Sequence, residues 1–155
     1  MRAPFTISPA TGRVLFPDLR LELSPQLPQA EFVAATARLN GDDLGANDGW
    51  QRYSIRELIA GDLKIGLFVI FLNGQLLRAG FAYGSKDDTW DNWSEEKEAS
   101  LQREYQQELD AQLSGKNTFP WGKASILLDS KSGGTNIWID YSGAPSPAGK
   151  PSATT

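Results

Sequence analysis

Residues 63–84, LKIGLFVIFLNGQLLRAGFAYG, decide the fold that this sequence predicts. Asn73-Gly74 lies between two runs of strand-forming residues, and this dipeptide favours a two-residue hairpin turn because both residues tolerate positive φ. The first run is apolar at consecutive positions, which predicts a central strand covered on both faces. The second run is more mixed, since Arg78 and Gly80 interrupt it. The segment therefore predicts an antiparallel hairpin at the centre of a sheet.

Outward from this hairpin, strand and helix patterns alternate with short turns. Residues 19–23, LRLEL, alternate apolar and polar side chains, as a strand with one wet face does. Residues 41–49, GDDLGANDG, are rich in Gly, Asn and Asp and predict a polar surface loop. The other predicted elements are a hairpin within 5–16, a short helix at 28–39, strands at 50–55, 118–128 and 135–141, and a long helix at 93–113.

Together these elements predict a single α+β domain over residues 1–142. Its sheet is expected to be mostly antiparallel, with one short and one long helix packed on one face. Residues 143–155 contain no large apolar side chain, so we expect them to form a disordered tail.

The residue types that are missing limit the chemistry of the chain. There is no His and no Cys among the 155 residues. Zinc sites built on imidazole or thiolate, thiol nucleophiles and Ser-His-Asp triads are thereby excluded. We expect a protein that is not an enzyme and that uses no metal or cofactor. The longest apolar run has eight residues and no signal-peptide pattern opens the chain, so we also expect a cytoplasmic location and no membrane contact.

Charge is concentrated in one part of the sequence. Residues 87–110 hold nine acidic residues against two basic ones, a net of −7, so the remainder carries +3 within a total of −4. A single-sign acidic surface repels nucleic acid and attracts basic partners. The sequence therefore predicts a protein partner, with a basic toxin domain as one option, and no nucleic acid.

The most acidic stretch, residues 87–98 (DDTWDNWSEEKE), allows three interpretations. Asn92 and Glu95 have the spacing of a helix capping box, Asp91 or Ser94 can serve as the cap instead, and acids in the first turn favour the helix dipole. A calcium site is a second interpretation, although the stretch lacks the glycine of a calcium loop. The third is a partner-binding surface that combines tryptophans with carboxylates. Its candidate residues are Asp87, Asp88, Trp90, Asp91, Trp93, Glu95 and Glu96.

The last third of the chain resembles a known group of proteins. After WDNWSEEKE and a helix come Phe119 to Gly122, Asp129 to Gly134, and a final strand from Ile137 to Tyr141. This succession over some fifty residues resembles the C-terminal region of small bacterial proteins of the toxin-immunity type. The resemblance implies a role in neutralising a toxin and names no catalytic residue.

The sequence thus predicts a cytoplasmic binding protein that neutralises or escorts a protein partner, such as an immunity protein does. Two other classes of function stay open. One is a small-molecule-binding or hydrolytic domain that uses carboxylates in a pocket. The other is a structural subunit of a larger assembly, which an uncovered apolar edge would favour.

Overall fold

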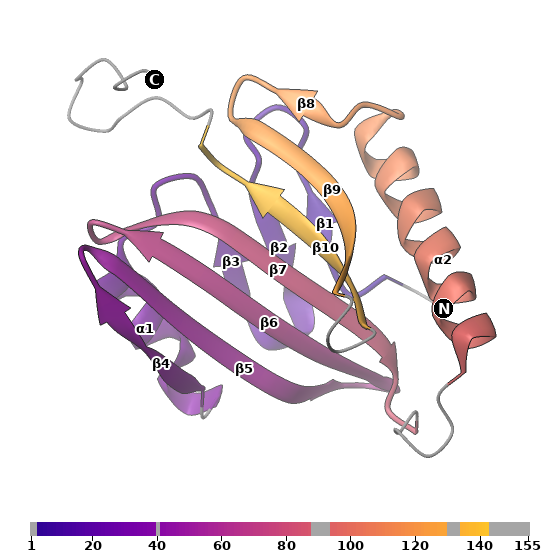
Figure 1. Ribbon diagram of the computed structural model, residues 1–155, viewed down its shortest axis with the longest axis horizontal. Coiled ribbons are helices and arrows are strands. Elements are labelled where there is room, and N and C mark those ends of the chain that lie inside the picture. The colour runs from indigo at the N-terminus through magenta and orange to yellow at the C-terminus, as the bar shows by residue number, and fades with distance from the viewer. Residues whose placement is uncertain (1–2, 40, 88–93, 130–133, 143–155) are drawn as a thin grey trace.

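The computed structural model describes residues 3–39, 41–87, 94–129 and 134–142. Its main sheet is antiparallel and has the strand order β4-β5-β6-β7-β10-β9-β8. A second antiparallel sheet has the order β1-β2-β3 and lies behind the main one (Figure 1). The predicted α+β class, mostly antiparallel sheet with one short and one long helix, is confirmed. The strands of the main sheet are β4 (Asp42–Asn47), β5 (Trp50–Ala60), β6 (Leu63–Leu72), β7 (Gln75–Ser85), β8 (Thr118–Phe119), β9 (Gly122–Asp129) and β10 (Gly134–Asp140).

The hairpin of β6 and β7 forms as the sequence predicts. Leu72 pairs with Gln75, and the two residues between them have φ of 51° at Asn73 and 84° at Gly74. Positive φ at both turn positions is the signature of a type I′ turn, whose twist matches that of the strands it joins. This turn fixes the register, and therefore decides which side chains of β6 and β7 share a face.

One face of the main sheet is packed against the small sheet. The small sheet consists of β1 (Thr6–Ile7), β2 (Val14–Phe16) and β3 (Leu21–Leu23). The rings of Phe5 and Phe16 meet Phe81 of β7 edge-on, with ring centroids 4.9 and 5.1 Å from its centroid. Phe81, like Val14 and Leu23, is fully buried. This aromatic contact is the centre of the hydrophobic core.

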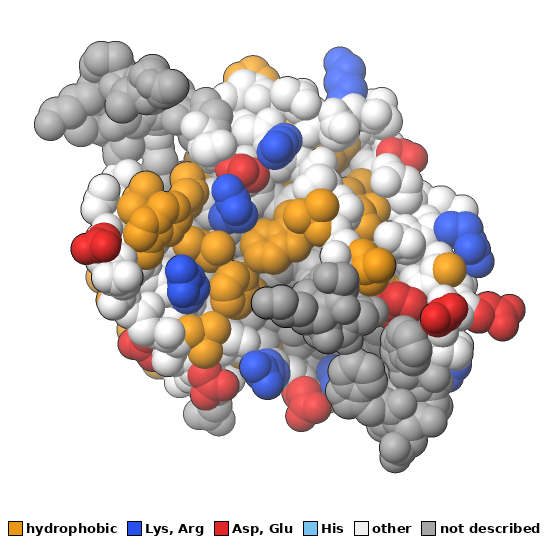
Figure 2. Space-filling model, in the orientation of Figure 1, with side chains coloured by type: hydrophobic (Ala, Val, Ile, Leu, Met, Phe, Trp, Pro, Cys, Tyr) orange, Lys and Arg blue, Asp and Glu red, His pale blue; other side chains and the backbone are white. Residues whose placement is uncertain are grey.

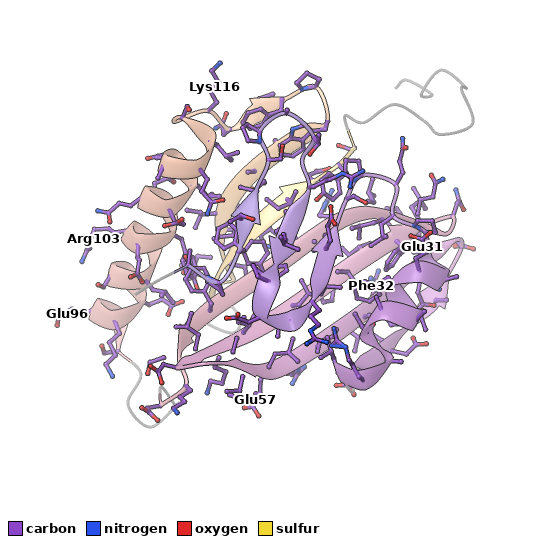
Figure 3. All side chains as sticks on the ribbon, turned by 180° about the vertical axis from the view of Figure 1, so that it is seen from behind. Glu31, Phe32, Glu57, Glu96, Arg103 and Lys116 are labelled. Atoms are coloured by element: carbon purple, nitrogen blue, oxygen red, sulfur yellow. The ribbon has the colours of Figure 1, made fainter. Side chains whose placement is uncertain are left out.

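The two helices complete the same layer as the small sheet (Figures 1 and 3). Helix α1 (Gln29–Thr36), followed by a 3-10 turn (Ala37–Leu39), points Phe32 toward the sheet, where its ring packs 5.3 Å from that of Phe71. Helix α2 (Glu95–Leu113) buries a stripe at four-residue spacing, formed by Tyr105, Leu109 and Leu113. The covered face of the main sheet therefore carries helices and small sheet together.

Helix α2 begins at Ser94, one of the caps that the sequence allowed. The Ser94 hydroxyl accepts a hydrogen bond from the Lys97 N–H at 3.1 Å. The alternative caps Asp91 and Asn92 lie outside the described residues. At the other end, Ser114 and Gly115 both adopt positive φ, and the Gly115 N–H donates to the Asp110 carbonyl at 3.0 Å. This left-handed turn ends the helix at Leu113, where the predicted helix 93–113 also ends.

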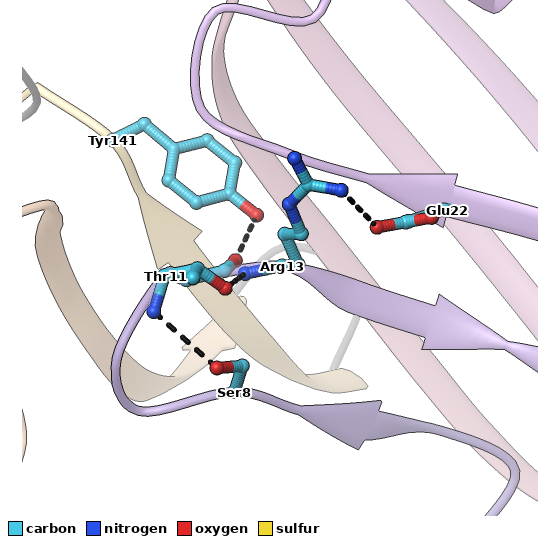
Figure 4. A network of polar contacts seen from close by, with 6 residues as sticks. Ser8, Thr11, Arg13, Glu22 and Tyr141 are labelled. Carbon is cyan, nitrogen blue, oxygen red and sulfur yellow. Dashed lines mark hydrogen bonds and ion pairs between the residues drawn. The ribbon is translucent and has the colours of Figure 1, made fainter.

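The C-terminal strand region holds the N-terminal sheet in place. The Tyr141 hydroxyl donates to the Gly12 carbonyl at 2.6 Å, close to the ion pair between Arg13 and Glu22 (Figure 4). Trp121, which is 4% exposed, donates its indole N–H to the Pro9 carbonyl at 2.9 Å. The turn between β1 and β2 is therefore anchored by residues more than a hundred positions away in sequence.

Two predictions about the main sheet are wrong. Residues 41–49 are not a loop, because Asp42–Asn47 pairs with β5 as an exposed edge strand that contains a bulge. Strand β6 is not equally covered on its two faces either: Phe68, Ile70 and Leu72 are only half-buried, whereas Leu67, Val69 and Phe71 on the other face are fully buried. The predicted tail, residues 143–155, lies outside the described part of the chain.

Candidate functional site

The uncovered side of the main sheet, which we call the open face, is unusually apolar. Residues paired across antiparallel strands point to the same side, so the register assigns the members of this face. Figure 2 shows the resulting apolar area, interrupted by basic side chains. The apolar members are Trp50, Ile59, Phe68, Ile70, Leu72, Leu127 and Trp138, of which Ile59 and Leu127 are 58% and 54% exposed.

Trp138 is the centre of the open face. It pairs with Gly80 across β10 and β7, and its ring lies over that glycine. A Cβ added to Gly80 would stand 2.8 Å from the six-membered part of the indole, so only glycine leaves room for the ring there. The Phe68 ring meets Trp138 edge-on at 5.9 Å. The two aromatic rings form a nearly continuous apolar platform with Ile70.

The charge of the open face is mainly positive. It carries Arg52, Arg56, Lys64, Arg78 and Lys123 together with the acidic Asp42, Glu57 and Asp140. Arg78 and Asp140 form an ion pair at 3.4 Å. Within the described residues, Arg52, Arg56 and Lys123 form no ion pair. Further acidic charge lies on the first turn of α2, where Figure 3 shows Glu96 pointing away from the sheet.

At one end of the main sheet, α2 separates β7 from β10. Their ladder stops at the pair Phe81 and Ile137, and two residues further it would place Tyr83 opposite Thr135. Instead, the Tyr105 hydroxyl accepts from the Tyr83 N–H at 2.7 Å and donates to the Tyr83 carbonyl at 2.6 Å. The Glu98 carboxylate accepts from the Thr135 N–H at 2.6 Å. Two side chains of the helix thus take the hydrogen bonds that neighbouring strands would otherwise exchange.

The tyrosines of this region are shielded from water. Burial raises the pKa of Tyr105 well above its ordinary value, and the carboxylates of Glu98 and Glu104 add to the effect. The pKa of Tyr83 is raised for the same reason, with Glu108 as the largest charge contribution. Both phenols therefore stay protonated as hydrogen-bonding groups at physiological pH.

A cavity of about 540 Å³ opens where the strands separate. Its wall combines small residues of the open face with the first half of α2. The Thr135 hydroxyl, which borders it, is buried and has no hydrogen-bond partner among the described residues. The residues that line the cavity include Arg56, Gly66, Ala82, Gly84, Glu98 and Tyr105.

A second hollow, of about 1040 Å³, lies between the small sheet and α2. Asp18, Asp62 and Glu108 contribute carboxylates to its wall. Across the described ranges, no three acidic side chains come close enough together to hold a metal ion. The carboxylates of this hollow therefore do not form the metal-binding arrangement that hydrolysis at a bound ion would need.

The sequence-predicted binding residues are only partly placed by the structure. Asp87 is exposed after β7, and Glu95 and Glu96 are exposed in the first turn of α2. Asp88, Trp90, Asp91 and Trp93 lie outside the described residues. The open face was missed by sequence reasoning, although a signal existed: a strand that is apolar at consecutive positions, beside a strand with a glycine at position 80.

Comparison with protein-family models, with curated proteins and with solved structures gives no match for this chain. In the described part of the chain, no helix is long and apolar enough to cross a membrane. The open face and the cavity at its end are therefore the features of the molecule that bear on its function.

Proposed function

We propose that the chain is a non-catalytic binding protein whose open face binds an acidic protein partner. The observation that carries the proposal is the uncovered platform of Trp138, Phe68 and Ile70, with basic residues placed among its apolar ones. Large contiguous apolar areas on a protein surface mark interaction sites, because leaving them in water is unfavourable. Aromatic and arginine side chains are also the residues most enriched in binding hot spots.

The positive charge of the open face specifies the partner. Arg52, Arg56 and Lys123 lie among the apolar residues and form no ion pair within the described part of the chain, and the face carries five bases against three acids. An acidic partner surface would complement them, speed association and fix the orientation of the complex. A second copy of the chain placed face to face would bring like charges together, which opposes self-association through this surface.

A protein suits this surface better than a nucleic acid does. Rings are present on the open face at Trp50, Phe68 and Trp138, but four aliphatic side chains share the face with them. Ile59, Ile70 and Leu127 are aliphatic and offer no ring on which a base could stack. Their chemistry matches instead the apolar centre of a protein–protein interface.

The exposed acids of α2 favour a second candidate surface. Glu95 and Glu96 belong to the acidic patch predicted from the sequence, and a basic partner such as a toxin domain would complement it. Neutralisation of a toxin is the role that the resemblance to immunity proteins implies. The two surfaces lie on different elements, so the same experiment can separate them.

The experiment is affinity capture of the full chain with chemical cross-linking, in three matched forms. They are the wild type, an open-face variant (Arg52→Glu with Lys123→Glu) and an α2 variant (Glu95→Lys with Glu96→Lys). We expect one stoichiometric partner that is released by salt, lost with the open-face variant, retained by the α2 variant, and cross-linked near β6 and β10. Loss of the partner with the α2 variant alone would move the site to the acidic patch. A partner retained by both variants would contradict both surfaces.

A further inference from the structure

Two glycines lie on the open face of the neighbouring strands β6 and β7, diagonally across from each other, but they have different surroundings. Gly80 of β7 pairs with Phe68 and is covered by the Trp138 ring. Gly66 of β6 pairs with Ala82, two positions further along the same face. A Cβ built on Gly66 meets nothing within 4 Å. Glycine within a strand weakens it, unless a ring or another group packs over the exposed backbone.

The empty space over Gly66 belongs to the cavity at the separated end of the main sheet. Ala82 and Gly84 extend its floor, so three small residues stand together where the rest of the open face carries Phe68, Ile70 and Trp138. Because Tyr105 and Glu98 hold the backbones of β7 and β10, the separation of these strands is fixed by hydrogen bonds. The cavity is therefore a built feature of the fold.

We propose that this cavity receives an aromatic side chain of the acidic partner, laid flat on Gly66 as Trp138 is laid on Gly80. The inference rests on the proposed function and names the anchor that the partner would supply. The volume of about 540 Å³ is within the range of pockets that enclose ring-sized groups. Partner aromatics that enter such pockets are typical binding hot spots.

Charged side chains of β5 lie at the cavity, close to the place proposed for that ring. Arg56 lies in the bulge of β5 beside Gly66 and is exposed, and it forms no ion pair among the described residues. A guanidinium at this place can stack on an aromatic face and also bind a neighbouring carboxylate. Glu57 of the same bulge is acidic and disfavours a second carboxylate on its side. The cavity wall as a whole holds three bases and three acids, so its charge is balanced and the ring itself is the part of the partner that this site specifies.

The test uses N-acetyl-tryptophanamide as a probe and amide NMR of the full chain as the readout. We expect saturable shifts at Gly66, Ala82 and Gly84, with a dissociation constant on the order of 1 mM, since a single side chain has few atoms to contribute. N-acetyl-leucinamide should bind at least several-fold more weakly. Gly66→Val should occupy the space directly over position 66, prevent a ring from lying flat there and abolish the shifts. A Cβ at position 66 meets no described neighbour within 4 Å, so the fold should remain intact. The unchanged remainder of the spectrum would report this.

Three results would overturn the inference. One is the absence of saturable shifts, and another is equal binding of the leucine and tryptophan probes. The third is binding only after Trp90 and Trp93 are both replaced by Ala, which would assign the ring to this chain. If the partner is lost with Arg52→Glu and Lys123→Glu but retained by Gly66→Val, the anchor is wrong while the proposed function stands. A partner indifferent to all of these variants contradicts the proposed function itself.

Discussion

The covered and open faces of the main sheet are built from the same strands, yet they serve different purposes. On the covered face, Phe71 and Phe81 are fully buried under the small sheet and the helices. On the open face, Phe68 and Trp138 are comparably large but remain partly in contact with solvent. Both faces of β6 are therefore apolar, although only one of them contributes to the core.

The difference separates residues that fold the chain from residues that are available for binding. Burial under another layer gives an apolar side chain its stabilising effect, about 25 cal/mol for each Å² removed from water. Ile59 and Leu127, more than half exposed, obtain only a small part of that stabilisation. Their presence is better explained by a partner that covers them later.

The largest contrast is expected from truncating one phenylalanine on each face. Phe81→Ala should lower the free energy of unfolding by about 3–5 kcal/mol, because it leaves a cavity beneath Phe5 and Phe16. Phe68→Ala should cost less than about 1.5 kcal/mol, since its ring is already partly in water. Urea denaturation of the two variants measures both values. Equal losses would mean that the open face is part of the folding core.

The second-largest effect is expected from alkaline pH, which should destabilise the covered face. Burial raises the pKa of Tyr83, Tyr105 and Tyr141 above the ordinary value of 10.0 that each has when unfolded. Above pH 10 the unfolded chain loses these protons first, so the folded state binds more protons and stability falls as pH rises. Each tyrosine should contribute about 1 kcal/mol of loss between pH 10 and 11, roughly 3 kcal/mol together. Urea unfolding at both pH values measures it, and Tyr141→Phe should reduce the loss by about a third.

Tyr105→Phe tests the hydrogen bonds that hold the two strands apart. The substitution leaves the buried N–H and carbonyl of Tyr83 without partners, so we expect a loss of about 2–3 kcal/mol. Tyr53→Phe is a matched control, because the Tyr53 hydroxyl only accepts from the half-buried Gln29 amide, and about 1 kcal/mol is expected. Similar losses in both variants would show that the phenol of Tyr105 is not a structural substitute for strand pairing.

The smallest effect concerns the cap of α2, which lies at the acidic end of the molecule. Ser94→Ala should lower the free energy of unfolding by about 1 kcal/mol, because the Lys97 N–H loses its acceptor. Asn92→Ala should change it by less than about 0.5 kcal/mol. A larger effect at Asn92 would restore the capping box that its spacing with Glu95 suggests.

The sequence predicts the fold well where the pattern is local. The Asn73-Gly74 turn, the long helix at 93–113 and the alternation of residues 19–23 all depend on neighbouring residues. The structure has the turn and the helix, but its strand covers only residues 21–23 because Leu19 ends a 3-10 turn (Pro17–Leu19). Strand β4 was missed because Asp42–Asn47 has no apolar pattern. Its strand conformation comes from pairing with β5, a contact that propensity does not contain.

The candidate site is less accessible to prediction for a related reason. An apolar strand side looks the same in sequence whether a helix, a second sheet or nothing lies over it. Only the arrangement of the small sheet and both helices on one side reveals that Phe68 and Trp138 are uncovered. The acidic stretch attracted attention because its charges are consecutive, whereas Arg52, Arg78 and Lys123 are far apart in sequence and converge through register.

The position of β10 has a consequence for the order of events on the ribosome. This strand is made last among those described, yet it lies between β7 and β9. Until it emerges, β8 and β9 have no described strand through which to join the main sheet. The Gly12 carbonyl likewise lacks the hydrogen bond that it accepts from the Tyr141 hydroxyl. The nascent chain must also carry Phe5 and Phe16 without their partner until Phe81 of β7 emerges, an interval of seconds at typical translation rates of about 5–20 residues per second. A chaperone that shields Phe5 and Phe16 in that interval would act on a state that the finished protein no longer displays.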